Sequence, residues 1–426
     1  MRKASFFFTA LTAIVLSAAP LHAQLTPERI ARDKGIAYGV RHSYDPGTIV
    51  ETPAPKGYKP FYISHVGRHG SRYDLGDGGA YGRVSEALVR ADSIGILTTE
   101  GQKLLGEVRT MMDTQKGMHE MLTQRGCREH RGIAERMMKR FPQVFSSKTR
   151  TEVDAVSSEV QRCILSMSNF LLALGSGNPE LDITMDTGSK YMRYLMVWDG
   201  RHRSSMRSVR SESRAYLEAN LDPSRLFGVL FSQPDSVHVD PYDFCRNLFV
   251  CSAYTECMDL EDKVDIAAFF TPEEFFVLAA NDSDVFYAEN GNSPLYGEKT
   301  AAQGRRLLQD IITKADVALE QGSRRAADLR FTHDTAILPL CTLMDFSGVD
   351  ICVEQTRAHE QVCTGDVIMM GSNLQIIFYS SKRNPEILVK VLYNEKERTF
   401  KALDAVEGPY YRWSDLKEYF NARIQR

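Results

Sequence analysis

The sequence has little that would direct the chain to a membrane, to nucleic acid or to zinc. Beyond the first 23 residues, no stretch is long and apolar enough to span a bilayer. The formal charge of −3 over 426 residues gives no overall attraction to nucleic acid or anionic lipid. Any recognition of anions must therefore be local. The eight cysteines include no Cys-x-x-Cys pair and match no zinc spacing.

The first 23 residues have the layout of a secretory signal peptide. Arg2 and Lys3 precede an uncharged, largely apolar run over residues 6–19, and Ala23 offers a small residue for cleavage. The run is too short for a comfortable transmembrane helix, and no cysteine follows it to carry a lipid anchor. We therefore expect a secreted protein, with a periplasmic destination, that begins near residue 24 and has no membrane anchor.

Export would allow disulfide bonds to form. Cys245, Cys251 and Cys257 lie at intervals of six residues, and Cys352 with Cys363 could close a local loop. Buried unpaired thiols are the alternative, and the spacing leaves both open.

Strand and helix patterns alternate on either side of a middle segment that has few strand signals. Before that segment, helical patterns at 83–94, 99–116 and 123–140 lead to a strand at 153–156 and a helix at 163–174. After it, a helix at 300–320 is followed by strands at 328–331, 374–379 and 387–392 and a closing helix at 413–423. We expect a layered α/β core, made of residues 24–175 and 300–426, with a mixed, largely parallel sheet flanked by helices.

Residues 176–299 are interpreted as a smaller, mostly helical domain inserted in that core. Thr271-Pro272-Glu273-Glu274 is typical of a helix start, with a threonine cap, a proline at the first position and a glutamate at the third. The segment contains no internal repeat and no low-complexity tract. Its arginine-rich part is interpreted as a solvated helix face or as a basic rim for polyphosphorylated substrates; its members are Arg193, Arg201, Arg203, Arg207, Arg210 and Arg214.

Three predicted strands end in polar residues that suit a phosphate group. The first ends in the segment 68–72, Arg-His-Gly-Ser-Arg; the second runs into 158–162, which ends in Arg162; the third ends in His333-Asp334. Ligands of open α/β sheets bind beyond the carboxyl ends of the strands. If the three strands are parallel neighbours, their ends converge on one site with three arginines, two histidines and one carboxylate.

This set of side chains supports phosphoryl transfer through a covalent intermediate. A histidine nitrogen can attack phosphorus in line with the ester oxygen, while guanidiniums bind the equatorial oxygens and offset their charge. Nearby positive charge keeps the attacking nitrogen unprotonated at mildly acidic pH. An alkoxide is a poor leaving group and needs a proton, which Asp334 could donate and later recover from water.

These segments resemble the histidine acid phosphatase family, which includes acid phosphatases and phytases. The resemblance covers about residues 60–175 and 325–380, and it includes a Leu-Thr-x-x-Gly helix start at 122–126. It implies an α/β core with a smaller helical domain over the site, no metal and no cofactor, and a small phosphate monoester as the binding partner. It also implies roles for six residues: His69 as nucleophile, Asp334 as proton donor, and Arg68, Arg72, Arg162 and His333 as phosphate ligands.

Two features of this chain depart from the family pattern. Family members usually have Arg-x-Pro where this chain has Arg72-Tyr73-Asp74, and often have arginine where Val156 stands. The related multiple inositol polyphosphate phosphatases typically use His-Ala-Glu as the donor segment, whereas residues 333–335, His-Asp-Thr, resemble the members with an aspartate donor.

Two other functions compete with the phosphatase. A phosphotransferase similar to phosphoglycerate mutase would use the same histidine, but export separates it from cytosolic substrates. A protein that only binds phosphate esters would keep the pocket. His69 and Asp334, however, are reactive groups that a site without catalytic activity tends to lose. The sequence leaves the physiological substrate and the oligomeric state open.

Several other polar residues are expected to lie outside the chemistry. His65 is interpreted as part of the strand before the motif. Arg41-His42 resembles the motif superficially but has no preceding strand and no following glycine. His130 and His359 are expected at the surface.

Overall fold

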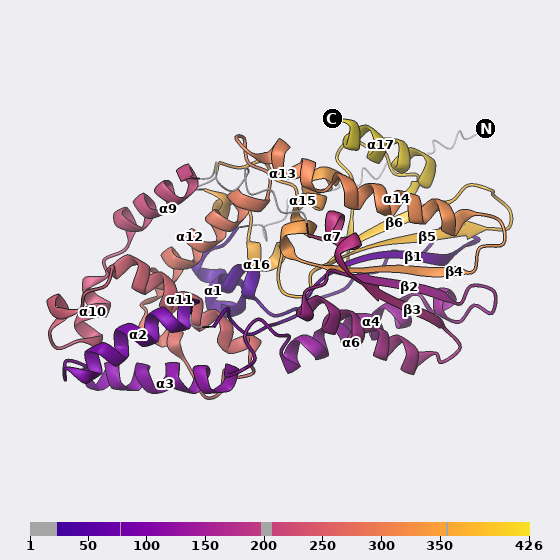
Figure 1. Cartoon of the computed structure of the whole chain (residues 1–426). Helices are drawn as coiled ribbons and strands as arrows, with labels where there is room; N and C mark the ends of the chain where they lie inside the picture. The colour runs from indigo at the N-terminus through magenta and orange to yellow at the C-terminus, as the bar shows by residue number, and fades with distance from the viewer. Residues whose placement is uncertain (1–23, 77, 197–206, 355–356) are drawn as a thin grey trace, which may run out of the picture.

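A single mixed sheet forms the centre of the computed structural model, which describes residues 24–76, 78–196, 207–354 and 357–426 (Figure 1). The eight strands lie in the order β3-β2-β4-β1-β5-β6-β7, with β8 paired to β6. The first four strands in this order are parallel, and the pairs from β1 to β5 onward are antiparallel. The strands are β1 (Tyr58–Arg68), β2 (Glu152–Ser157), β3 (Asp182–Thr187), β4 (Arg325–Thr332), β5 (Asn373–Ser381), β6 (Leu388–Tyr393), β7 (Lys396–Arg398) and β8 (Tyr410–Arg412).

Helices cover both faces of the sheet. Successive side chains of a strand point to opposite faces, and here both faces carry apolar side chains that the helices bury. Tyr62 and Val66 of β1 belong to the apolar cluster of the upper face, whereas Ile63 belongs to that of the lower face. Figure 1 shows α14 and α17 above the sheet and α4 and α6 below it. The helices around the sheet are α4 (Gln124–Arg140), α5 (Pro142–Phe145), α6 (Gln161–Gly177), α7 (Ser189–Leu195), α13 (Gly297–Gln303), α14 (Arg305–Leu319), α15 (Asp334–Met344) and α17 (Trp413–Gln425).

A helical part lies beside the sheet, at the left of Figure 1, and has an apolar core of its own. Its longest helix, α12, begins with the predicted capping box, in which Thr271 and Glu274 bond each other's backbone. Its elements are α1 (Pro27–Arg32), α2 (Ala80–Ser93), α3 (Thr99–Gln115), α9 (Arg207–Asn220), α10 (Ser224–Leu230), α11 (Pro241–Cys257), α12 (Pro272–Asn290) and α16 (Thr364–Val367) and the 3₁₀ segments η1 (Lys34–Arg41), η2 (Pro234–Ser236), η3 (Ile266–Phe269) and η4 (Ala358–Glu360).

The prediction of a layered α/β fold with a largely parallel sheet is confirmed. The arrangement adds two details to the predicted organisation: α2 and α3 share the apolar core of α10, α11 and α12, and β3 pairs with β2 at the edge of the sheet although it lies within residues 176–299. The predicted helix at 300–320 is divided at Gly304 into α13 and α14. A side chain there would meet the backbone of Leu340 at 2.9 Å, so only glycine allows α15 to approach so closely.

The eight cysteines are unpaired, and most are buried. Cys245, Cys251 and Cys257 all lie on α11 inside the helical part, where they pack as small apolar residues. The possible loop-closing pair of Cys352 and Cys363 is not formed. Of the two alternatives that the spacing left open, the structure has unpaired thiols.

The predicted signal peptide lies outside the described residues. Among the residues that the structure does describe, no helix combines the length and the hydrophobicity needed to cross a membrane.

Candidate active site

Three strand ends meet at one edge of the sheet. Strands β2, β4 and β1 are parallel neighbours, as the convergence hypothesis required. The register places Arg68 opposite Thr332, and the backbone N–H of His69 donates to the Thr332 carbonyl at 2.9 Å. On the other side of β4, the N–H of Ser158 donates to the Phe331 carbonyl at 3.0 Å. The carboxyl ends of β2, β4 and β1 are therefore in register, and all three polar segments begin at the same edge of the sheet.

His69 is buried, and its ring orientation is fixed by its own loop. Its Nδ1 lies 2.9 Å from the carbonyl oxygen of Gly70. A carbonyl can only accept, so Nδ1 carries the proton and Nε2 is left with a free lone pair. Burial lowers the pKa of His69 well below its ordinary value, and the charges of Arg162 and Arg68 lower it further. The imidazole is thus neutral, and its Nε2 is the unprotonated nitrogen.

Arg68 is locked in place by three groups at once. It is 2% exposed. One terminal nitrogen donates to the carbonyls of Val40 at 2.6 Å and Ile368 at 2.8 Å, and the other lies 2.6 Å from a carboxylate oxygen of Asp334. The two carbonyls hold the Arg68 guanidinium so that it faces the Asp334 carboxylate. Arg68 and Asp334 thus form a charge-assisted ion pair in a fixed geometry.

Arg72 and Arg162 complete the basic lining from two other elements. The Arg72 side chain folds over the ring of Tyr254 on α11, with its guanidinium carbon 5.5 Å from the ring centroid, so the helical part contributes a wall of the site. Arg162 is the second residue of α6, and its Nη1 forms an ion pair of 3.0 Å with Glu120. Both arginines act electrostatically on His69.

His333 and Asp334 lie where β4 ends and α15 begins. The rings of His69 and His333 meet edge to face at a centroid distance of 5.5 Å, and Nε2 of His333 is 3.1 Å from the hydroxyl of Ser158. Burial and the charge of Arg162 lower the pKa of His333 to about 3. The Asp334 carboxylate accepts from the N–H of Thr335 at 2.8 Å.

The pKa of Asp334 reflects two opposing effects. Burial is the largest single effect and raises the pKa of this carboxyl, but the Arg68 guanidinium, the N–H of Thr335 and the charge of Arg72 act together against it and leave the pKa below its ordinary value. In the free site, Asp334 is therefore a carboxylate bound to Arg68.

The loop that carries His69 is held by α4 and α6. The N–H of Gly70 donates to Ser166 at 3.1 Å, while the N–H and hydroxyl of Ser71 donate to Glu129 at 2.7 and 2.6 Å. A Cβ on Gly70 would lie 2.8 Å from the backbone of Gly126 in the first turn of α4. Thr123 caps that helix, at the helix start predicted at 122–126. The glycine after the histidine is needed because loop and helix pack so closely.

The structure brings together all six residues that the sequence analysis selected. It also adds neighbours that the analysis had not assigned to the site: Ser158 next to His333, Tyr254 next to Arg72, and Glu120 next to Arg162. Ser158 lies in the segment 158–162, which the sequence analysis had selected as a polar strand end. That position could have indicated that Ser158 is near the site. Tyr254 and Glu120 have no signal in the sequence, because each reaches the site through tertiary packing.

The segment around Arg41 lies closer to the site than expected. The Val40 carbonyl holds Arg68, and the Arg41 guanidinium carbon lies 5.9 Å from the centroid of the same Tyr254 ring that Arg72 contacts. Arg41 also pairs with Asp282 of α12 at 2.8 Å. The lack of a preceding strand did not place this segment far from the site, because the 3₁₀ segment η1 brings Val40 and Arg41 close to it.

The expectation that His130 and His359 are at the surface is wrong. His130 is fully buried, because it shares the inward face of α4 with Ile133 and Met137. His359 is held by Asp284, whose carboxylate lies 2.8 Å from Nδ1. In both cases a helix or turn buries a residue type that is otherwise often exposed.

His65 lies within β1, as expected.

The arginine-rich stretch is described in part, since Arg201 and Arg203 lie outside the described residues. Arg207 and Arg210 are exposed on α9, and Arg214 pairs with Asp240 at 2.8 Å.

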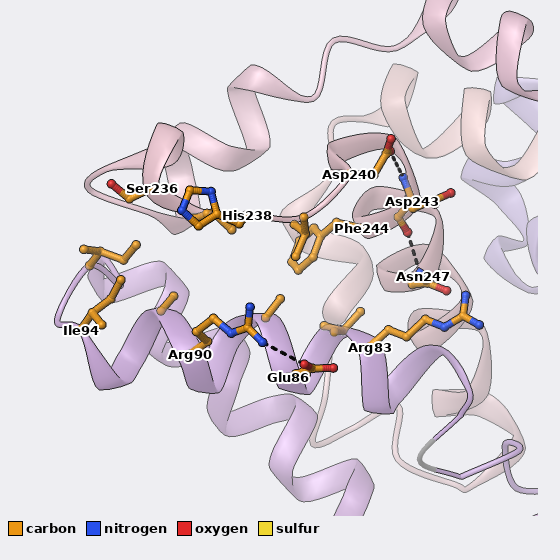
Figure 2. Close-up of a pocket in the computed structure, with 16 residues that line it drawn as sticks. Arg83, Glu86, Arg90, Ile94, Ser236, His238, Asp240, Asp243, Phe244 and Asn247 are labelled. Atoms are coloured by element: carbon orange, nitrogen blue, oxygen red, sulfur yellow. Dashed lines mark hydrogen bonds and ion pairs between the residues drawn. The ribbon is translucent and has the colours of Figure 1, made fainter.

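A separate cavity of about 320 Å³ lies between α2 and residues 236–247. Figure 2 shows Phe244 and Ile94 at this cavity, together with Arg90, which is paired with Glu86 at 3.0 Å. None of the six predicted site residues lines it. The cavity is therefore distinct from the strand-end site.

Comparisons with known proteins agree with this site. The family model described as histidine phosphatase superfamily (branch 2) matches residues 65–394. The multiple inositol polyphosphate phosphatase 1 of Homo sapiens is 24% identical over 306 residues, which cover 66% of this chain and 62% of that protein. The match thus spans only about three fifths of this curated relative.

Solved structures show the same fold. The multiple inositol polyphosphate phosphatase of Bifidobacterium longum, in complex with inositol hexasulfate, has a TM-score of 0.76 at 17% identity, over 89% of this chain and 96% of that one. The phytase of D. castellii has a TM-score of 0.71 at 17% identity, over 98% of this chain and 90% of that one. Proteins of both names thus share this fold.

The relatives are phosphomonoester hydrolases, the class of enzyme that the sequence predicted. The family model covers all three strand ends that converge at the candidate site. The chain belongs to branch 2 of the histidine phosphatase superfamily.

Proposed function

We propose that this protein hydrolyses phosphate monoesters through a phosphohistidine formed on His69. The observation that carries the proposal is the ring of His69: its Nδ1 is bound to the Gly70 carbonyl at 2.9 Å, so the lone pair of Nε2 is free within a basic, buried site. Attack by Nε2 on phosphorus forms the N–P bond and breaks the bond to the ester oxygen. Water then cleaves the N–P bond and releases phosphate.

The cationic groups around His69 supply the electrostatic stabilisation. Arg68 and Arg72 come from the end of β1 and the loop after it, Arg162 comes from α6, and the charge of each lowers the pKa of His69. One guanidinium can bind two phosphoryl oxygens at once. The neutral His333 ring adds a hydrogen-bonding group. Preorganised donors of this kind stabilise the charge that develops on the phosphoryl oxygens.

Asp334 is proposed as the proton donor to the leaving oxygen. In the free site, Arg68 keeps it ionised. A bound phosphate ester competes for Arg68 and places negative charge beside the carboxylate, and both effects raise the pKa of Asp334. Substrate binding would thus be accompanied by uptake of the proton that Asp334 later donates.

The test uses aryl and alkyl phosphates with a chelator present. His69→Ala should reduce hydrolysis of both to background. Asp334→Asn should lower kcat for an alkyl phosphate by about 10²–10⁴-fold, the range of general acid catalysis, but lower it far less for nitrophenyl phosphate, whose leaving group needs no proton. Turnover that requires added metal, or that survives in His69→Ala, would rule out the mechanism; equal losses on both esters would remove Asp334 from the acid role.

Inositol polyphosphates are the proposed substrate class. The similar proteins include multiple inositol polyphosphate phosphatases and a phytase, and Arg41 adds a further cation beside Tyr254 at the edge of the site. In the same assay, kcat/KM for phytate should exceed that for simple sugar phosphates. The reverse order would favour a general acid phosphatase.

We also propose that the protein is exported by a signal peptide over residues 1–23. Residues 24–175 and 300–426 are proposed to carry the phosphatase core, and residues 176–299 to be an insertion that supplies most of the helical part, although α2 and α3 pack with the helical part and β3 joins the sheet. N-terminal sequencing of protein from a periplasmic fraction tests the export. A chain that retains its first residues there, or that stays in the cytoplasm, would contradict it.

A further inference from the structure

Glu120 occupies an unusual position for a carboxylate, because it meets an arginine that the proposed reaction needs. It lies in the connection between α3 and α4, which passes from the helical part to the lower face of the sheet in Figure 1. Its carboxylate oxygen is 3.0 Å from Nη1 of Arg162. After burial itself, the charge of Arg162 contributes most to lowering the pKa of His69. A carboxylate is therefore bound where a phosphoryl oxygen would be expected.

The backbone holds Glu120 in this position at some cost. Its φ of 61° lies in the left-handed region, which glycine adopts readily and other residues adopt rarely. The N–H of Glu120 donates to the Asp74 carbonyl at 2.9 Å, and the N–H of Tyr73 donates to the Met121 carbonyl at 3.0 Å. The connection is thus joined to the segment that directly follows Arg72. Strained residues of this kind cluster at functional sites, where the surrounding structure enforces them.

Arg162 retains hydrogen-bonding capacity besides this pair. Its side chain is 13% exposed, and its Nε is buried without a hydrogen-bond partner among the residues that the structure describes. Glu120, by contrast, is 49% exposed and can turn toward solvent at low cost. An incoming phosphate, with more than one charged oxygen, would bind the guanidinium in a bidentate manner and displace the single carboxylate contact.

We propose that Glu120 is an internal competitor for the phosphate site: it occupies Arg162 in the free enzyme and must leave when a phosphate group binds. This inference rests on the proposed phosphate site, but it does not require that the bound ester be hydrolysed. Glu120 sets the affinity of the site for phosphate and thereby limits inhibition by the product. It contacts no reacting atom in this role and acts through Arg162 alone.

The experiment measures binding of inorganic phosphate by calorimetry, in the full-length mature protein without any ester present. Glu120→Gln removes the charge and should tighten phosphate binding about two- to fivefold, the range of a partly exposed ion pair. The KM for an aryl phosphate and the inhibition constant for phosphate should fall by the same factor, with kcat unchanged or lower. Glu418→Gln, an exposed glutamate on α17, is the matched control and should change none of these values.

A second comparison separates competition from a positioning role. Glu120→Gln introduced into an Arg162→Ala background should have no effect on phosphate affinity, because the group it competes for is gone. Glu120→Gly removes the carboxylate and relieves the left-handed backbone, so it should bind phosphate as tightly as Glu120→Gln does. Unchanged or weaker phosphate binding in Glu120→Gln would overturn the inference. Absence of ester hydrolysis in the wild type would instead overturn the proposed function.

Discussion

The charge of each side chain at the site is set by the neighbours that the fold gives it. His69 and His333 are neutral because they are buried among arginines, whereas Asp334 is ionised because Arg68 lies 2.6 Å away. Neutral imidazoles among guanidiniums can accept a phosphoryl dianion without first losing protons. In the proposed reaction these charge states would be set before the phosphate ester binds, which is the condition for strong electrostatic stabilisation.

Ser158 offers a test of how much this preparation depends on single contacts. Its hydroxyl lies 3.1 Å from Nε2 of His333, and removing one such hydrogen bond costs about 1 kcal/mol. Ser158→Ala should therefore lower kcat/KM for an aryl phosphate about fivefold. Ser168→Ala is the control, because that hydroxyl donates within α6 to the Ile164 carbonyl. A Ser158→Ala enzyme with full activity would show that His333 needs no such support.

At the scale of elements, the site depends on how closely helices approach the loop after β1. Gly126 in the first turn of α4 is the tightest of these approaches, because a Cβ there would lie 2.4 Å from the Ser71 carbonyl oxygen and 2.6 Å from a methyl of Leu122. Both neighbours would have to move, and the Ser71 backbone belongs to the loop that carries His69. Helix packing and the position of the His69 loop are thus coupled at one residue.

Gly126→Ala should lower the free energy of unfolding by about 1–3 kcal/mol, as overpacking does, and should reduce kcat because the loop shifts. Gly106→Ala makes the same change in the exposed interior of α3, where a Cβ would meet nothing within 4 Å. That variant should be more stable than wild type by about 0.4–1 kcal/mol, with unchanged kcat. Urea unfolding and steady-state kinetics measure both. If the two alanines behaved alike, the packing explanation would fail.

Elements and strand-end residues could be predicted because their signals are local. The pattern before Arg68 predicted β1, and the segments at 122–126 and 271–274 predicted the starts of two helices. Contacts made across the fold could not be predicted in this way. The pairing of Glu120 with Arg162 depends on how a connection between two helices lies against the loop after β1, and the approach of Tyr254 depends on the docking of the helical part.

Burial of single polar residues inside helices was also beyond the local signal. His130 follows the same helical periodicity as Ile133 and Met137, but the sequence does not show that aromatic rings will enclose it. The structure places its ring 5.7 Å from that of Phe331. Periodicity predicts which face is inward, whereas the choice between a buried and an exposed histidine depends on what covers that face.

At the scale of the whole molecule, buried histidines link folding to pH. His65 and His130 lie below the sheet, near Phe331, and the nitrogens of both rings lack hydrogen-bond partners within the described part of the chain. Burial lowers the pKa of each to about 3, and for His65 the neighbouring His130 and Arg330 add to this effect. The unfolded chain binds protons at these histidines near pH 6.5, so below that pH it binds more protons than the folded protein does.

The sign of the effect follows from this difference in proton binding. The stability that neutral His65 and His130 allow is fully present above pH 6.5 and decreases as the pH falls toward 3. Each histidine should reduce the free energy of unfolding by about 1.4 kcal/mol per pH unit over this range. At pH 5 the loss is about 2 kcal/mol for each residue. His69 and His333, which are also shifted downward, add to the acid sensitivity of the wild type.

Replacing both buried histidines by leucine should therefore make the protein more resistant to acid. His65→Leu/His130→Leu keeps apolar packing of similar size in a site where neither ring is hydrogen bonded, and it removes two groups that must be protonated on unfolding. Urea unfolding at pH 5 and at pH 7.5 measures the effect: the variant should lose about 4 kcal/mol less than the wild type between the two values. Between pH 7.5 and 8.5 the two proteins should show the same dependence, which is the internal control. Parallel profiles below pH 6.5 would mean that these two histidines do not carry the linkage.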